Sequence, residues 1–163
     1  MTPKILKIHT MDNHTNLNEV VSKDVSTLDT LHEVAEEVLS LCTPQQTATV
    51  ITLRGDLGAG KTAFTKELAG ILDIQSEITS PTFVIMKSYA IPHHAFLKTL
   101  VHIDAYRIES DDEMRVLGFK HLLDDPTNLI CIEWPENIMR CIPTDAHTVA
   151  ITLHADGSRT IEY

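Results

Sequence analysis

The chain has 163 residues, of which 43% are hydrophobic and 22% charged, a composition typical of one globular domain with a real core. Its 13 Lys and Arg residues against 23 Asp and Glu residues give a formal net charge of −10, and because such a surface repels a phosphate backbone we expect no direct nucleic-acid binding. No apolar run approaches the roughly 18 residues that a membrane-spanning helix needs, so no membrane association is expected.

The N-terminus and the cysteines bear on where the protein works. Residues 1–26 contain neither the apolar core of a signal peptide nor the arginine-rich pattern of a transit peptide. The three cysteines, Cys42, Cys131 and Cys141, form no C-x-x-C pair and have no metal-ligand spacing. We therefore expect a cytoplasmic protein whose cysteines are reduced and serve mainly as small apolar residues.

The N-terminal region is predicted to hold an extension and then a helix. Residues 1–25 carry no motif and are interpreted as either a short added strand or a disordered tail, of which we favour the tail. A helix is predicted from about Thr27 to Leu41, with Ser26-x-x-Asp29 as its capping box. The apolar stripe of this helix, expected to pack in the core, is Leu28, Leu31, Val34, Ala35 and Val38.

The next stretch carries the strongest motif of the chain. An apolar run over residues 48–53 leads into residues 55–62, which match the phosphate-binding P-loop pattern G-x-x-x-x-G-K-[ST]. Apolar residues then recur at helical spacing, at Phe64, Leu68, Ile71 and Leu72. The motif therefore lies between a predicted strand and a predicted amphipathic helix, which is the context that a P-loop requires.

A P-loop binds nucleotide phosphates largely through its backbone. Its glycines let successive N–H groups point at phosphate oxygens, and the N-terminus of the following helix adds partial positive charge. Lys61 can reach the β- and γ-phosphates, and the Thr62 hydroxyl can ligate Mg²⁺. We predict a nucleotide site formed by Gly55, Asp56, Leu57, Gly58, Ala59, Gly60, Lys61, Thr62 and Ala63.

Two apolar runs after the P-loop helix are predicted to form a hairpin. Residues 83–86 and 100–103 are its two strands, and residues 88–98 are predicted to be a loop. Just before the hairpin, Ser80-Pro81-Thr82 places hydroxyl groups where a nucleotide-sensing loop would lie, so Thr82 joins the predicted nucleotide-binding residues. An ordinary Ser-Pro turn is the alternative interpretation.

The remaining elements follow from simple patterns. Residues 110–124 are predicted to be helical with an interruption at Gly118, and residues 129–132 are predicted to form a buried strand. Residues 147–153 and 159–163 flank Asp156-Gly157, which predicts a C-terminal hairpin.

Two of the predicted strands stop abruptly at an acidic residue. Asp104 follows residues 100–103, and Glu133 follows residues 129–132. Ligands of α/β sheets bind beyond the carboxyl ends of the strands, where a P-loop enzyme needs a carboxylate to hold Mg²⁺ directly or through water. Either acid could instead merely end its strand at the solvent, and the residues alone leave open which of the two contacts the metal.

Taken together and in order, four segments resemble the TsaE (YjeE) family of bacterial tRNA threonylcarbamoyladenosine biosynthesis proteins. They are the P-loop at 55–62, Ser80-Pro81-Thr82-Phe83, His102-Ile103-Asp104-Ala105-Tyr106-Arg107 and Ile132-Glu133-Trp134-Pro135-Glu136. The resemblance runs from about residue 26 to residue 136. It implies one P-loop ATPase domain over residues 26–163, of the α/β class, with a mixed parallel and antiparallel sheet flanked by helices.

The same resemblance implies a function. It implies an ATP hydrolase that uses ATP and Mg²⁺, is slow alone, and acts on the TsaB–TsaD heterodimer during modification of the adenosine beside the tRNA anticodon. It also implies that Lys61, Asp104 and Glu133 are catalytic and that Thr62 and Glu133 hold Mg²⁺. Asp104 would then serve the attacking water or the outer shell of the metal.

The P-loop has two other interpretations. A P-loop kinase for a small metabolite is the alternative function, but kinase lids usually carry several basic residues, and the region after Glu133 has only Arg140 before the final hairpin. A GTPase-like switch would need an Asn/Thr-Lys-x-Asp sequence, which the chain lacks. Trp134 is interpreted either as a docking anchor for a partner or as a core residue.

Overall fold

Three of the predicted apolar runs form the parallel centre of one sheet. In the computed structural model, which describes residues 20–163, these strands are β2 (Thr49–Arg54), β5 (Asn128–Glu133) and β4 (Thr99–Asp104). Nearly every residue in them is buried, as expected for strands that are covered on both faces. A fourth strand, β6 (His147–Leu153), runs parallel to β2 on its other side.

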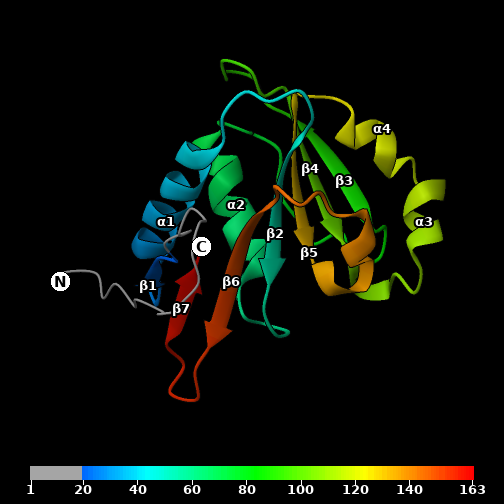
Figure 1. Cartoon of the computed structure of the whole chain (residues 1–163). Helices are drawn as coiled ribbons and strands as arrows, with labels where there is room; N and C mark the ends of the chain where they lie inside the picture. The colour runs from blue at the N-terminus through cyan, green and yellow to red at the C-terminus, as the bar shows by residue number, and fades with distance from the viewer. Residues whose placement is uncertain (1–19) are drawn as a thin grey trace, which may run out of the picture.

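Antiparallel strands complete the sheet at both edges (Figure 1). At one edge, β3 (Met86–Ala90) pairs with β4, and at the other, β7 (Arg159–Glu162) pairs with β6. A short outermost strand, β1 (Ser22–Asp24), pairs with β7, so the strand order is β1-β7-β6-β2-β5-β4-β3. The predicted mixed sheet of an α/β fold is confirmed.

Helices cover both faces of the sheet, which makes two core layers. In Figure 1, α1 (Leu28–Leu41) and α2 (Lys61–Ile71) lie on one side of the sheet. The other side carries α3 (Asp111–Val116), α4 (Phe119–Leu123) and the 3-10 segment η2 (Pro135–Cys141). The side chains of β5 alternate between the two layers, which leaves Glu133 on the same face as α2.

The predicted helix after residue 26 begins with a different cap. Thr27, not Ser26, is the N-cap, and its hydroxyl accepts the N–H of Thr30 at 3.2 Å. The Ser26 hydroxyl instead accepts the backbone N–H of Arg159 on β7. This shift makes Leu28 the first helical residue, and its side chain is 71% exposed, so it is not part of the buried stripe. The other four residues of the predicted stripe are buried.

The predicted hairpin exists, but its first strand starts three residues later than predicted. Pro81 carbonyl oxygen accepts the N–H groups of Val84 and Ile85, so the chain turns there and does not extend. Phe83 and Val84 are therefore exposed, and β3 runs through Ala90 into the predicted loop. A short 3-10 turn, η1 (Ala105–Arg107), follows β4.

Gly118 and the C-terminal hairpin lie as predicted, whereas residues 22–24 form the added strand and not the favoured tail. Gly118 separates α3 from α4 with a φ of +74°, a left-handed conformation that favours glycine. The C-terminal hairpin of β6 and β7 is confirmed, with Gly157 in its turn. Part of the predicted N-terminal extension is the added strand β1, whereas residues 1–19 lie outside the described residues. None of the described helices has the length and hydropathy that a bilayer crossing requires.

Candidate functional site

The P-loop is fixed in place by a close approach to β6. The loop leaves the end of β2, and α2 begins at Lys61. Gly55 has a φ of +144°, and a Cβ atom at this position would lie 2.4 Å from the carbonyl oxygen of Ile151. Only glycine fits there, because any side chain would collide with backbone and not with a movable group. The first glycine of the motif therefore sets where the loop sits relative to the sheet.

Lys61 lies against the carbonyl groups of its own loop. Its Nζ donates to the Gly55 oxygen at 2.6 Å and to the Asp56 oxygen at 3.0 Å, and it lies 4.0 Å from the centre of the Trp134 ring. The residue is only 4% exposed. Burial lowers the pKa of the Lys61 ammonium, and the nearby carboxylates of Glu133 and Asp104 act in the opposite direction. The ammonium group is thus held at the loop with acidic groups around it.

The two predicted acids lie side by side at the ends of adjacent strands. Asp104 and Glu133 are partners in the parallel register of β4 and β5, and both are buried. Oε1 of Glu133 accepts the Thr62 hydroxyl at 2.8 Å. Oδ1 of Asp104 accepts the backbone N–H of Tyr106 at 3.0 Å, while its Oδ2 accepts the Thr82 hydroxyl. Glu133 is therefore tied to the start of α2, and Asp104 is tied to residues 80–82, which we call the hydroxyl loop.

The residues present fit a magnesium ion. Mg²⁺ prefers oxygen ligands and is usually bound through one or two carboxylates together with water and phosphate. The Thr62 hydroxyl donates its proton to Glu133 and keeps its lone pairs available. Oε2 of Glu133 has no hydrogen-bond partner among the described residues and is not buried. The donor set at this point is thus made of oxygen atoms alone.

A cavity of about 400 Å³ joins these groups. Among the predicted site residues, the cavity is lined by Leu57, Gly58, Gly60, Lys61, Thr62, Ala63, Thr82, Asp104 and Glu133. Gly55, Asp56 and Ala59 do not line it, although Asp56 and Gly55 supply the carbonyls that hold Lys61. The structure thus gathers the P-loop, the hydroxyl loop and both acids around one space.

Three further residues contribute to the site without having been predicted to do so. Trp134 is half-buried with a φ of +57°, and its ring contacts both Lys61 and Tyr106, so it belongs to the wall of the cavity. Arg159 on β7 donates from Nε to the Ala59 oxygen and so supports the P-loop from outside. His102, completely buried on β4, contacts Glu133. A polar residue within an apolar strand was the available sequence signal for His102.

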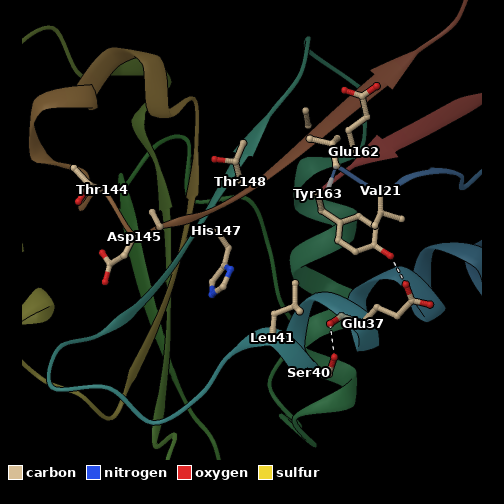
Figure 2. Close-up of a pocket in the computed structure, with 13 residues that line it drawn as sticks. Val21, Glu37, Ser40, Leu41, Thr144, Asp145, His147, Thr148, Glu162 and Tyr163 are labelled. Atoms are coloured by element: carbon tan, nitrogen blue, oxygen red, sulfur yellow. Dashed lines mark hydrogen bonds between the residues drawn. The ribbon is translucent and has the colours of Figure 1, made fainter. Parts of the chain in front are cut away.

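A second, larger cavity differs in its chemistry (Figure 2). It has a volume of about 1010 Å³ and lies between the end of α1, β6, β7 and the segment before β6. Among the described residues, its lining includes Glu37, Asp145 and Glu162 but no lysine, arginine or glycine. Figure 2 shows the Tyr163 hydroxyl pointing at Glu37, with which it forms a hydrogen bond. The smaller cavity has carboxylates too, but it also has Lys61 and the P-loop backbone, which can attract and bind phosphate, so it is the candidate nucleotide site.

Comparisons with known proteins agree on one family. Residues 25–161 match the family model described as "Threonylcarbamoyl adenosine biosynthesis protein TsaE". The chain is 40% identical over 112 residues to a tRNA threonylcarbamoyladenosine biosynthesis protein TsaE of Treponema pallidum, which covers 69% of this chain and 78% of the relative. A relative of the same name from Haemophilus influenzae is 31% identical over 148 residues, covering 90% and 88%. A crystal structure of Bacillus subtilis YdiB superimposes with a TM-score of 0.66 at 26% identity, covering 91% of this chain and 86% of that one.

Proposed function

This chain belongs to the TsaE family of tRNA threonylcarbamoyladenosine biosynthesis proteins, and on that premise we propose that it is a Mg²⁺-dependent ATPase acting on the TsaB–TsaD heterodimer. Its relatives are named for the modification pathway. The ATPase activity is proposed from the chemistry of the site, and the partner from the resemblance of the four motifs.

One observation carries the ATPase proposal. The hydroxyl of Thr62, directly after the P-loop lysine, donates to Glu133 at the end of the strand next to β2. In P-loop NTPases the Mg²⁺ is held by the P-loop Ser or Thr and by an acid on a neighbouring strand. The pairing of Thr62 with Glu133 has this arrangement.

The proposal gives the P-loop, Lys61, Thr62, Glu133 and Asp104 separate tasks. The backbone N–H groups of the P-loop and of the first turn of α2 orient the phosphates, and Lys61 supplies positive charge to them. Bound Mg²⁺, held by Thr62 and Glu133, would neutralise charge on the phosphate oxygens. Asp104 would orient the attacking water molecule, and its hydrogen bond from the Thr82 hydroxyl supports this role by fixing the carboxylate.

The cavity favours hydrolysis over transfer to a metabolite. Among the described residues that line it, Lys61 is the only lysine or arginine, whereas a kinase normally clamps the transferred phosphoryl group with additional cations. Steady-state release of ADP by the purified full-length chain, with and without Mg²⁺ and with and without candidate acceptors, tests the proposal. Release that requires an added acceptor would favour the kinase, and an absence of release under every condition would contradict the ATPase.

Glu133→Gln is expected to weaken Mg²⁺ binding and so to raise the Mg²⁺ concentration that turnover requires. The amide can still accept from Thr62 but has lost the negative charge that a divalent cation requires. We expect turnover to fall by about 10- to 100-fold and the Mg²⁺ concentration for half-maximal turnover to rise. Glu136→Gln, which removes an exposed carboxylate three residues away, is the matched control and should leave the Mg²⁺ titration unchanged. Identical titrations for Glu133→Gln and the wild type would remove Glu133 from the metal site.

Asp104→Asn is expected to separate turnover from binding. If Asp104 orients the attacking water, this variant keeps its affinity for ATP and loses about 100-fold in turnover, the pattern of an interaction made in the transition state. Asp112→Asn, on the exposed surface of α3, is the control. If the variant instead binds nucleotide poorly but hydrolyses each bound ATP at the wild-type rate, the assignment is reversed and Asp104 is the metal-binding acid.

A further inference from the structure

His102 contacts the proposed metal-binding acid from within the core. Its side chain is completely buried on β4, and its Nε2 lies 2.8 Å from Oε1 of Glu133. In the register of β4 and β5 it faces Cys131, so it reaches Glu133 diagonally, two residues further along the neighbouring strand. His102 does not line the nucleotide cavity. The contact therefore comes from behind the site.

Two donors converge on one oxygen of Glu133. Oε1 accepts from His102 and, also at 2.8 Å, from the Thr62 hydroxyl. Oε2 makes no hydrogen bond to a described residue and is not buried. A carboxylate held through one oxygen by two donors on different elements has a fixed orientation, and its other oxygen remains available at the cavity.

The other nitrogen of the imidazole shows what this contact requires. Since an ionised carboxylate oxygen can only accept, Nε2 is the donor in this contact. Nδ1 is buried and has no hydrogen-bond partner within residues 20–163. An apolar side chain would fill the same space without leaving a buried polar atom unpaired, which is unfavourable. The feature that the imidazole supplies, and an apolar residue would not, is the N–H directed at Glu133.

We propose that His102 is a positioning residue that orients the Glu133 carboxylate for Mg²⁺ bound together with the nucleotide. This inference rests on the proposed function, because it assigns His102 a task at that same site. It predicts that replacing His102 reduces the increase in nucleotide affinity caused by Mg²⁺. The affinity for nucleotide in the absence of Mg²⁺ should not change.

The test uses the single tryptophan of the chain. Trp134 lines the cavity beside Lys61, so its fluorescence reports ADP binding without any need for turnover. The affinity of the full-length chain for ADP is measured with and without Mg²⁺, and the gain caused by Mg²⁺ is compared among variants. His102→Leu is expected to reduce that gain by about 10-fold or more, with the Mg²⁺-free affinity unchanged.

Two further variants and a control make the result specific. His102→Gln keeps an N–H donor at a similar reach and should restore most of the gain, whereas His102→Asn, whose amide is too short to reach Glu133, should not. Val101→Ala removes volume from the adjacent, completely buried residue of β4, in the core layer on the opposite face of the sheet. It should lower the melting temperature without changing the Mg²⁺ gain. If His102→Leu does not fold, the comparison of Gln with Asn decides.

The outcomes separate this inference from the function on which it rests. If His102→Leu or His102→Asn keeps the full increase in ADP affinity that Mg²⁺ causes in the wild type, the positioning role is refuted and the proposed function is not. A wild-type chain whose affinity for ADP does not respond to Mg²⁺ contradicts the proposed function, and the inference falls with it. The positioning role is supported if the Mg²⁺-dependent increase in ADP affinity is largest in the wild type, smaller in His102→Gln and smallest in His102→Asn and His102→Leu. This holds whether or not the isolated chain hydrolyses ATP.

Discussion

Replacing Lys61 with alanine is expected to lower ATP turnover by about 100-fold or more. The reason is that the described lining of the cavity contains no second lysine or arginine that could supply positive charge to the phosphates. The ammonium of Lys61 is also held at the loop by two backbone carbonyls, so the charge is already in place when phosphate arrives. Steady-state ADP release measures turnover, and calorimetric titration with ATP measures affinity.

The matched control lies on the same helix. Lys66→Ala removes an exposed lysine five residues further along α2, changing the net charge of the chain by the same amount. It should leave both turnover and affinity as in the wild type. If Lys61→Ala hydrolysed ATP as fast as the wild type, the P-loop would not be the site of the reaction.

Much of the site could be predicted because its signals are local in sequence. The P-loop is one continuous motif whose glycine spacing follows from the backbone geometry needed to approach phosphate. Asp104 and Glu133 end apolar runs, and parallel strands bring their carboxyl ends to one edge of the sheet. The structure places these two acids opposite one another in the register of β4 and β5.

The other features depend on contacts between distant segments. Thr27 caps α1, while the Ser26 hydroxyl accepts a hydrogen bond from the backbone N–H of Arg159 on β7. The choice of cap therefore depends on a strand far along the chain. The strand nature of residues 22–24 likewise depends on pairing with β7 at the far end of the chain. The contact of His102 with Glu133 depends on how β4 and β5 are aligned. No local pattern encodes such alignments.

Exposed apolar side chains occur in the lining of the nucleotide cavity and next to it in the sequence. Leu57 and Tyr106 line the cavity and are 83% and 54% exposed, while Phe83, next to Thr82, is 84% exposed. The guanidinium of Arg107 lies over the Phe83 ring, 4.6 Å from its centre. Large exposed apolar side chains in one region are typical of surfaces that bind other proteins. Since Phe83 directly follows Thr82, a protein bound to Phe83 would lie next to the Thr82 hydroxyl that donates to Asp104.

ATP turnover is expected to rise by about 100-fold or more when purified TsaB–TsaD complex is added. No arginine lies between Gly55 and Ile85, and Arg107 is exposed and stacked on Phe83, so the isolated chain has little positive charge to stabilise the transition state beyond Lys61. A positively charged group supplied to such a site accelerates related phosphoryl transfers by about 10³- to 10⁵-fold. The measurement is the steady-state rate of ADP release with increasing amounts of the complex.

Two exposed residues show whether stimulation acts through the apolar side chain next to Thr82. Phe83→Ala is expected to keep the unstimulated rate and to require more TsaB–TsaD for half-maximal stimulation, because it removes apolar area from the proposed contact. Val116→Ala, an equally exposed apolar residue on α3 that does not line the cavity, should respond like the wild type. A wild-type rate that the complex leaves unchanged would refute the proposed coupling to TsaB–TsaD. Equal stimulation of Phe83→Ala and Val116→Ala would place the contact elsewhere on the chain, because the loop next to Thr82 would then have no part in it.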